Sequence, residues 1–117
     1  MKTVCRTYEL CGRLWTTFYG TPAECAEADG GHDENYYNEV SGFTCSQRAI
    51  LYIVRDIQET TEYRQIVWWH EFCHSVLYSL GVPADLHDEV KVDAVAHMLY
   101  NYMTTKKGRV NLNGETT

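Results

Sequence analysis

Two histidines and a glutamate form an H-E-x-x-H sequence in the second half of the chain: His70, Glu71 and His74. On a helix, residues four apart lie about 40° from each other, so both imidazoles would project from one face. This spacing suits two ligands of one tetrahedral zinc ion. Glu71 lies about 100° round from His70, at the edge of that face, where it can reach a zinc-bound water more easily than the ion. A carboxylate in that place is suited to take a proton from the water.

A catalytic zinc ion usually has three protein ligands and one open position, so a third ligand is expected. Glu89 and Asp93 share one face of the next helical segment, at positions i and i+4. That face is otherwise apolar, and a buried charge is costly unless it is paired or binds a metal. Both carboxylates are therefore candidates to face the ion. His87, Asp88 and His97 are further candidates. We expect His87 to be exposed and His97 to be a buried or boundary residue.

The N-terminal part of the chain predicts a β-hairpin and a short helix. Residues 3–10 and 13–19 are rich in β-branched and aromatic side chains, and Cys11-Gly12 between them suits a turn. A helix over about residues 22–28 should follow, because the sequence T-P-A-E supplies an N-cap hydroxyl, a proline at the first helical position and a capping-box glutamate. Gly30-Gly31 would end this helix.

The middle of the chain predicts a loop, a strand and a long helix. Residues 30–43 are polar and contain glycine, which favours a surface loop, whereas residues 48–54 (RAILYIV) predict a strand. A helical pattern opens at Asp56-x-x-Glu59 and carries the H-E-x-x-H sequence. Gly81 is suited to end it.

A second helix should begin near Pro83–Asp85 and run to about Thr105, followed by a polar tail. We therefore expect a single domain over residues 1–107 and a C-terminal tail over residues 108–117. The buried face of this helix is expected to consist of Leu86, Glu89, Val92, Asp93, Ala96, Leu99, Tyr100 and Met103.

Composition narrows the functional classes. The chain has 117 residues, with ten Lys+Arg against sixteen Asp+Glu and a formal charge of -6. This charge argues against a nucleic acid or an anionic membrane surface as partner. No apolar run is long enough to predict a transmembrane helix, and the N-terminus has no apolar core of signal-peptide length. The five cysteines are an odd number, so we expect free thiols in a reducing, cytoplasmic setting.

Three segments together resemble a known group of proteins. They are R-A-I-L-Y-I-V, H-E-F-C-H-S-V-L-Y-S-L-G-V and D-E-V-K-V-D-A-V-A-H-M-L-Y-N-Y-M, which span about residues 42–103. They resemble the small HExxH zinc metallopeptidase-like proteins of phages and mobile elements, including relatives of the ImmA/IrrE group. The first 41 residues match nothing in this pattern. The resemblance implies a zinc-dependent peptidase acting on a peptide or protein, in the cytoplasm of a bacterial host if the protein is phage-encoded.

The same resemblance implies an α+β, zincin-like fold. A small N-terminal β-sheet would pack on the H-E-x-x-H helix, with an antiparallel C-terminal helix beside it. The segment E-V-K-V-D is similar to the second motif of the gluzincins, in which a Glu binds zinc and an Asp one turn later holds a ligand histidine. By this resemblance His70, His74 and Glu89 bind zinc, Glu71 is the general base, and Asp93 orients a histidine. The 14-residue spacer between His74 and Glu89 is shorter than in thermolysin, which leaves Asp93 open as the ligand.

Two further roles follow from the zincin resemblance. The strand before the motif helix, Arg48–Val54, would be a sheet edge that pairs with an extended substrate, or else an ordinary structural edge. A tyrosine or histidine would stabilise the oxyanion, and Tyr36, Tyr37 and His32 are the candidates.

A function of a different class also fits this sequence. The protein would be a catalytically silent, zinc-stabilised binding module that sequesters a host or partner protein. A chain of 117 residues leaves little room for the second lobe that usually walls a peptidase cleft. Replacing Glu71 by Gln distinguishes the two, because an enzyme loses its effect and a binding module keeps it.

Overall fold

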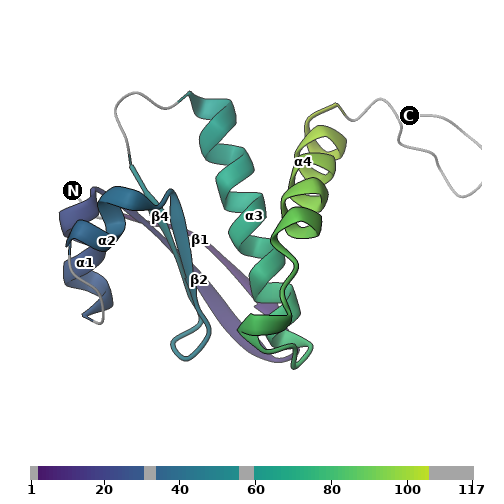
Figure 1. Ribbon diagram of the computed structural model, residues 1–117, viewed down its shortest axis with the longest axis horizontal. Helices are drawn as coiled ribbons and strands as arrows, with labels where there is room; N and C mark the ends of the chain where they lie inside the picture. The colour runs from purple at the N-terminus through teal and green to yellow at the C-terminus, as the bar shows by residue number, and fades with distance from the viewer. Residues whose placement is uncertain (1–2, 31–33, 56–59, 106–117) are drawn as a thin grey trace, which may run out of the picture.

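The computed structural model describes residues 3–30, 34–55 and 60–105. It is a small α+β domain (Figure 1). The elements in chain order are β1 (Thr3–Leu10), β2 (Arg13–Gly20), α1 (Pro22–Asp29), α2 (Glu34–Glu39), β3 (Gly42–Cys45), β4 (Ile50–Val54), α3 (Thr61–Ser79), a short 3-10 helix η1 (Ala84–Leu86) and α4 (Glu89–Thr105). None of the described helices is long and apolar enough to cross a membrane.

The four strands form one mixed sheet in the order β1-β2-β4-β3. The predicted hairpin is confirmed: β1 and β2 are antiparallel, with Leu10 opposite Arg13. Cys11 and Gly12 between them have φ angles of 52° and 80°, as a two-residue hairpin turn of type I′ requires. Strand β4 runs parallel to β2, and β3 is antiparallel to β4. Strand β3 is therefore an edge of the sheet.

Helices cover both faces of the sheet (Figure 1). Helices α1 and α2 pack over a core that includes Phe18, Cys25 and Tyr52. On the other face, Trp15 and Leu51 pack towards α3. Helix α4 packs against α3 and runs antiparallel to it (Figure 1). The layers therefore place α3 between the sheet and α4.

The local start and stop signals of α1 act as predicted. The backbone N–H of Glu24 donates to the Thr21 hydroxyl at 3.2 Å, and the Glu24 carboxylate accepts from the Thr21 N–H at 2.9 Å. Gly30 ends the helix with a φ of 70°. These contacts form a complete capping box, which satisfies N–H groups that the helix itself leaves unpaired.

The prediction of a loop over residues 30–43 is wrong for the part that the structure describes. Helix α2 and the first residues of β3 lie there. The reason is aromatic burial: Tyr37 is fully buried, and its ring lies 5.1 Å from that of Tyr36. The polar residues around these rings face solvent, so the composition of the segment hid an element that packs on the sheet.

The long helices also differ in their limits from the predictions. Helix α3 begins at Thr61, with the Thr60 hydroxyl accepting from the N–H of Tyr63, and the predicted start at Asp56–Glu59 lies outside the described residues. Its end is as expected, since Gly81 follows with a φ of 84°. The predicted tail over residues 108–117 lies outside the described residues too.

The second long helix starts later than predicted. Residues 84–86 form η1, and α4 begins only at Glu89. Asp88 caps α4, because its carboxylate accepts from the N–H groups of Val90 and Lys91 at 3.1 and 3.2 Å.

The predicted buried face of the second helix is only partly correct. Val92 and Ala96 are buried, and Leu99 and Tyr100 are half-buried. Since α4 packs against the single helix α3, it buries a narrow stripe. The remaining four predicted positions are exposed, namely Leu86, Glu89, Asp93 and Met103.

Candidate metal centre

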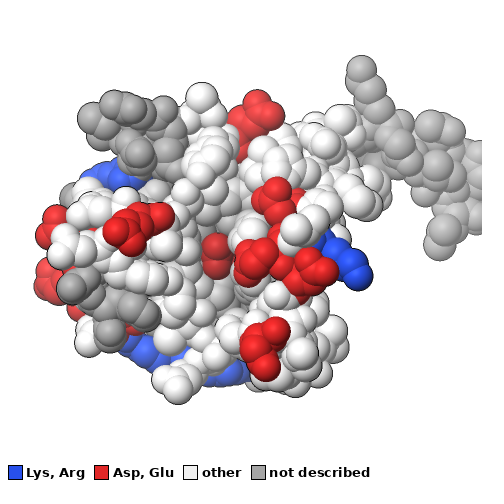
Figure 2. Space-filling model, viewed as in Figure 1, with Lys and Arg blue, Asp and Glu red and all other residues white. Residues whose placement is uncertain are grey.

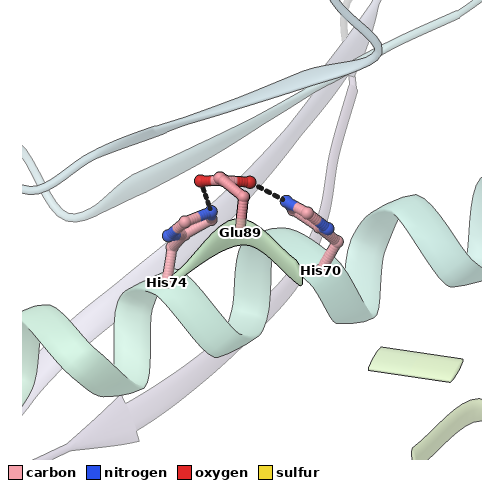
Figure 3. Close-up of side chains that lie close together, drawn as sticks. All are labelled: His70, His74 and Glu89. Carbon is pink, nitrogen blue, oxygen red and sulfur yellow. Dashed lines mark hydrogen bonds and ion pairs between the residues drawn. The ribbon is translucent and has the colours of Figure 1, made fainter. Parts of the chain in front are cut away.

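The centre is built where α3 faces the start of α4. His70 and His74 lie one turn apart on α3, with their ring centroids 5.0 Å apart. Glu89, the first residue of α4, reaches both: its Oε2 lies 3.1 Å from Nε2 of His70, and its Oε1 lies 3.0 Å from Nε2 of His74. Figure 3 shows the carboxylate between the two imidazoles. The ligand atoms of all three residues lie within 4.8 Å of one another.

The chemistry of these donors fits a zinc ion. Two imidazole nitrogens and one carboxylate oxygen form a set that zinc binds with an open fourth position. The His70 and His74 side chains are only 21% and 12% exposed, whereas the Glu89 side chain is 66% exposed. Glu89 thus closes the centre on its solvent side. Glu89 was expected to need a partner because its charge would be buried. The side chain is exposed instead, but its carboxylate still faces both histidines.

Asp93 lies one turn further along α4, beside the other nitrogen of His70. Its Oδ1 is 3.4 Å from Nδ1 of His70, and its Oδ2 is 3.6 Å from Nδ1 of His97. The carboxylates of Glu89 and Asp93 therefore face opposite nitrogens of one imidazole. His97 is exposed, in contrast to its predicted boundary position. This arrangement favours Glu89 as the ligand and Asp93 as the group that orients His70.

Glu71 is held beside the centre by strand β3. It is 8% exposed, and its Oε1 accepts a 2.6 Å hydrogen bond from the Thr44 hydroxyl. The same hydroxyl lies 3.2 Å from the Glu71 backbone oxygen. Burial raises the pKa of Glu71, and this outweighs the Thr44 hydrogen bond, which lowers it. Thr44 was not among the predicted site residues, because the first half of β3 was predicted as a loop and residues 44–47 were assigned to no element.

Gly42 gives Glu71 the space that it occupies. A Cβ at Gly42 would lie 2.9 Å from Cγ of Glu71 and 3.2 Å from the backbone oxygen of Tyr52. Contacts that short do not occur between unshifted atoms, so a side chain at residue 42 would force β3 and Glu71 apart. Strand β3 thus accommodates the Glu71 carboxylate in two ways. Gly42 leaves space for it, and the hydroxyl of Thr44, two residues further on, donates a hydrogen bond to it.

His87 is a second residue whose position differs from the prediction. It was expected to be exposed, yet it is half-buried, and its ring stacks on that of His74 with the centroids 5.0 Å apart. Nδ1 of His87 lies 2.7 Å from Nδ1 of His74, and Nε2 of His87 lies 2.9 Å from the Val82 backbone oxygen. The turn at Gly81–Pro83 reverses the chain and returns His87 to α3. The glycine and proline that follow the H-E-x-x-H helix were the sequence signal for this turn, and hence for the return of His87 to α3.

These contacts are consistent with one arrangement of the protons when His87 is neutral. The Val82 carbonyl only accepts, so Nε2 of His87 carries a hydrogen. In a neutral His87 the other nitrogen then accepts, and Nδ1 of His74 donates to it. His74 is then left with a lone pair on Nε2, 3.0 Å from a Glu89 carboxylate oxygen, and a bound cation would relieve the repulsion between these two acceptors. Desolvation by burial lowers the pKa of His74, which favours this neutral form.

The centre lies in a cleft of about 700 Å³ between β3, α3 and the N-terminal end of α4. Figure 2 shows acidic side chains gathered on the side of the molecule where α4 begins. Of the oxyanion candidates, Tyr36 lines the cleft. Tyr37 is fully buried and its hydroxyl donates to Asp29 at 2.8 Å, so its assignment to the oxyanion is wrong. His32 lies outside the described residues.

The prediction that Arg48–Val54 is the sheet edge is wrong. Strand β4 is paired on both sides, by β2 and β3. The strand that borders the cleft is β3, of which Gly42, Phe43 and Thr44 all contribute to the lining. The edge position was expected from the resemblance to zincins, in which the strand before the motif helix is the edge. Strand β4 is instead the more apolar of the two strands, and apolar strands belong inside a sheet.

No protein-family model, curated protein or solved structure matches this chain.

Proposed function

We propose that the protein is a zinc metallopeptidase in which His70, His74 and Glu89 bind Zn2+ and Glu71 is the general base. The observation that carries this proposal is the convergence of the three ligand atoms within 4.8 Å. The buried Glu71 carboxylate lines the same cleft. The proposal includes a zincin-like arrangement, a relation to the phage HExxH proteins, and a cytoplasmic setting.

In the proposed hydrolysis, Glu71 transfers the proton, and Asp93 and His87 orient the ligand histidines. A bound zinc ion would polarise the scissile carbonyl and lower the pKa of a water molecule. Glu71 accepts the proton of the attacking water and transfers it to the leaving amine. Its raised pKa suits a group that must both take and release a proton near neutral pH. Asp93 and His87 hold the two ligand imidazoles in orientation.

The substrate would be a peptide in extended conformation. Strand β3 lies at the sheet edge and borders the cleft, so its backbone can pair with a peptide by strand addition. Thr44 connects that edge to the catalytic carboxylate. Among the three oxyanion candidates, Tyr36 is the one whose place in the cleft supports the role.

The test compares wild type with Glu71→Gln and Glu62→Gln. Elemental analysis should give about one zinc per chain for all three proteins. Only Glu71→Gln should lose hydrolysis of peptides from a proteome digest, since Glu62 is exposed at the start of the same helix. A wild type that takes up no zinc overturns the metal centre. A zinc-loaded wild type without hydrolysis overturns the peptidase and leaves the centre intact.

The second candidate function, a zinc-stabilised binding module, is favoured by the outer side of α4. Val90, Met98 and Tyr102 are 80%, 67% and 63% exposed there. Apolar side chains gathered on one element often mark a protein-binding surface. In that case Glu71→Gln retains the biological effect of the protein. Replacing Met98 and Tyr102 by polar residues abolishes it.

A further inference from the structure

A second hollow lies on the other side of α3 from the histidines. It has a volume of about 320 Å³ and is bordered by β1, β2, β4 and α3. Arg6 of β1 and Arg64 of α3 both line it, together with Trp68. On a helix, Trp68 and His70 project about 200° apart, so this hollow is separate from the metal centre. We call it the arginine hollow.

Aromatic rings position both guanidinium groups. The guanidinium of Arg6 lies 4.9 Å from the ring centroid of Trp68, and that of Arg64 lies 5.0 Å from the ring centroid of Tyr19. Trp68 is itself fixed, because its indole N–H donates to the Thr17 hydroxyl at 2.8 Å. A guanidinium stacked on a ring face keeps its N–H groups directed outward in the plane of the group. The hollow thus has two oriented hydrogen-bond donors from elements far apart in the chain.

Among the described residues, these two arginines have no acceptor. Of the five arginines in the described part of the chain, Arg13, Arg48 and Arg55 each contact a carbonyl or carboxylate oxygen. Within the same described residues, Arg6 and Arg64 have ring contacts but no oxygen partner, and Nε of Arg64 is buried without one. Arg6 is exposed and Arg64 half-buried, so N–H groups of both guanidinium groups are open to an acceptor from outside the described residues. No acidic residue lines the hollow among the residues described.

We propose that the arginine hollow binds an oxyanion, the carboxylate or phosphate group of a ligand, between Arg6 and Arg64. Arginine matches the oxygens of both groups with paired hydrogen bonds. The formal charge of the chain is -6, yet the described lining of this hollow contains two arginines and no acidic residue. The hollow is therefore a positively charged site on an acidic protein. A bound anion would offset the positive charge of both guanidinium groups and accept from the N–H groups that face the hollow. The site does not depend on the metal centre.

The test follows the indole N–H signal of Trp68 by NMR while inorganic phosphate or acetate is added to the full chain. A saturable shift at millimolar concentration is expected with at least one anion. The anion that binds more tightly identifies the source as a phosphate or a carboxylate group. Arg64→Gln and Arg6→Gln should each weaken binding by about tenfold or more, since each removes a charge-assisted hydrogen bond. His70→Ala should leave binding unchanged.

Arg13→Gln is the matched control. Its guanidinium also lies over a ring, 5.5 Å from the centroid of Trp15, but it already donates to the Gln47 backbone oxygen. Binding should be unaltered in this variant. If neither anion shifts the Trp68 signal, or if Arg13→Gln weakens binding as much as Arg64→Gln, the proposal is overturned. Should Arg64→Gln unfold, Arg6→Gln decides, because Arg6 is exposed on β1.

Discussion

The hydroxyl of Thr44 and the carboxylate of Glu71 form a 2.6 Å hydrogen bond that joins the edge strand β3 to helix α3. The two residues are 27 positions apart in the chain. This bond connects the strand that would pair with a peptide to the group that would move the proton. A change in β3 should therefore affect both the stability of the domain and the orientation of Glu71.

Thr44→Val keeps the shape of the side chain and removes this bond. A buried carboxylate that loses a donor costs about 1–3 kcal/mol, so the free energy of unfolding should fall by that amount at neutral pH. Zinc content should stay near that of wild type, while the rate of hydrolysis falls. Urea unfolding and elemental analysis measure the two effects. Thr7→Val on the exposed side of β1 is the control and should change neither.

Gly42→Ala should destabilise the protein through a contact with Glu71. The added Cβ would meet Cγ of Glu71 at 2.9 Å, and such overpacking costs about 1–3 kcal/mol. Shortening Glu71 to Ala should relieve part of this cost. Unfolding free energies of the two single variants and the double variant form a cycle. Strictly additive values would contradict the contact.

Glu89 and Asp93 should differ in their effect on zinc binding. Glu89→Ala removes a direct ligand and should largely abolish zinc retention. Asp93→Ala removes a partner of His70 3.4 Å away and should weaken zinc affinity by about 10–100-fold. Asp85→Ala, exposed in η1, is the control. If Asp93→Ala loses the metal while Glu89→Ala keeps it, the roles are reversed.

Tyr8 should make the stability pH-dependent in alkali. Burial raises its pKa to about 12, while its hydroxyl donates to Ser75 at 2.8 Å. The unfolded chain releases this proton near pH 10, its ordinary range, so the contribution of Tyr8 is complete below pH 10 and is lost as the pH rises through about 12. The difference in unfolding free energy between wild type and Tyr8→Phe should therefore shrink over that interval. A difference that grows with pH would contradict the assignment.

The features of the fold and the site that the sequence predicts correctly are those set by local geometry. His70, Glu71 and His74 share one helix, so their spacing predicts that they lie together. The capping box of Thr21 and Glu24 spans a single turn, so its spacing predicts the start of α1. Strand β3 was not predictable by these rules. It is four residues long and gains its stability from β4 and α3, through contacts that depend on the tertiary fold.

The two carboxylates at the start of α4 show a second limit of prediction from the sequence. Periodicity placed Glu89 and Asp93 on the face of Val92 and Ala96, yet both carboxylates are exposed. They point to the histidines because they lie at the edge of the packed stripe, where a side chain reaches a neighbouring helix and still contacts water. Both carboxylates therefore face His70, although the burial from which a partner was inferred does not occur.

His87→Ala should weaken the metal centre without removing a ligand. With a neutral His87, Nδ1 of His74 donates to Nδ1 of His87 at 2.7 Å, which keeps the lone pair of His74 on Nε2. Without His87, both neutral forms of His74 become accessible and the ring loses its stacking partner. Zinc affinity should fall by about 10–100-fold, the usual effect of losing a group that orients a ligand. The nitrogen chemical shifts of His74 in the metal-free protein report the tautomer directly. They should indicate a proton on Nδ1 in wild type and a mixture in His87→Ala. His97→Ala, which alters an exposed histidine on α4, should change neither the tautomer of His74 nor the number of zinc ions bound. If His87→Ala instead loses zinc as completely as His74→Ala, then His87 is itself a ligand. The hydrogen bonds from the Val82 carbonyl through His87 to His74 would then be the wrong interpretation of this contact.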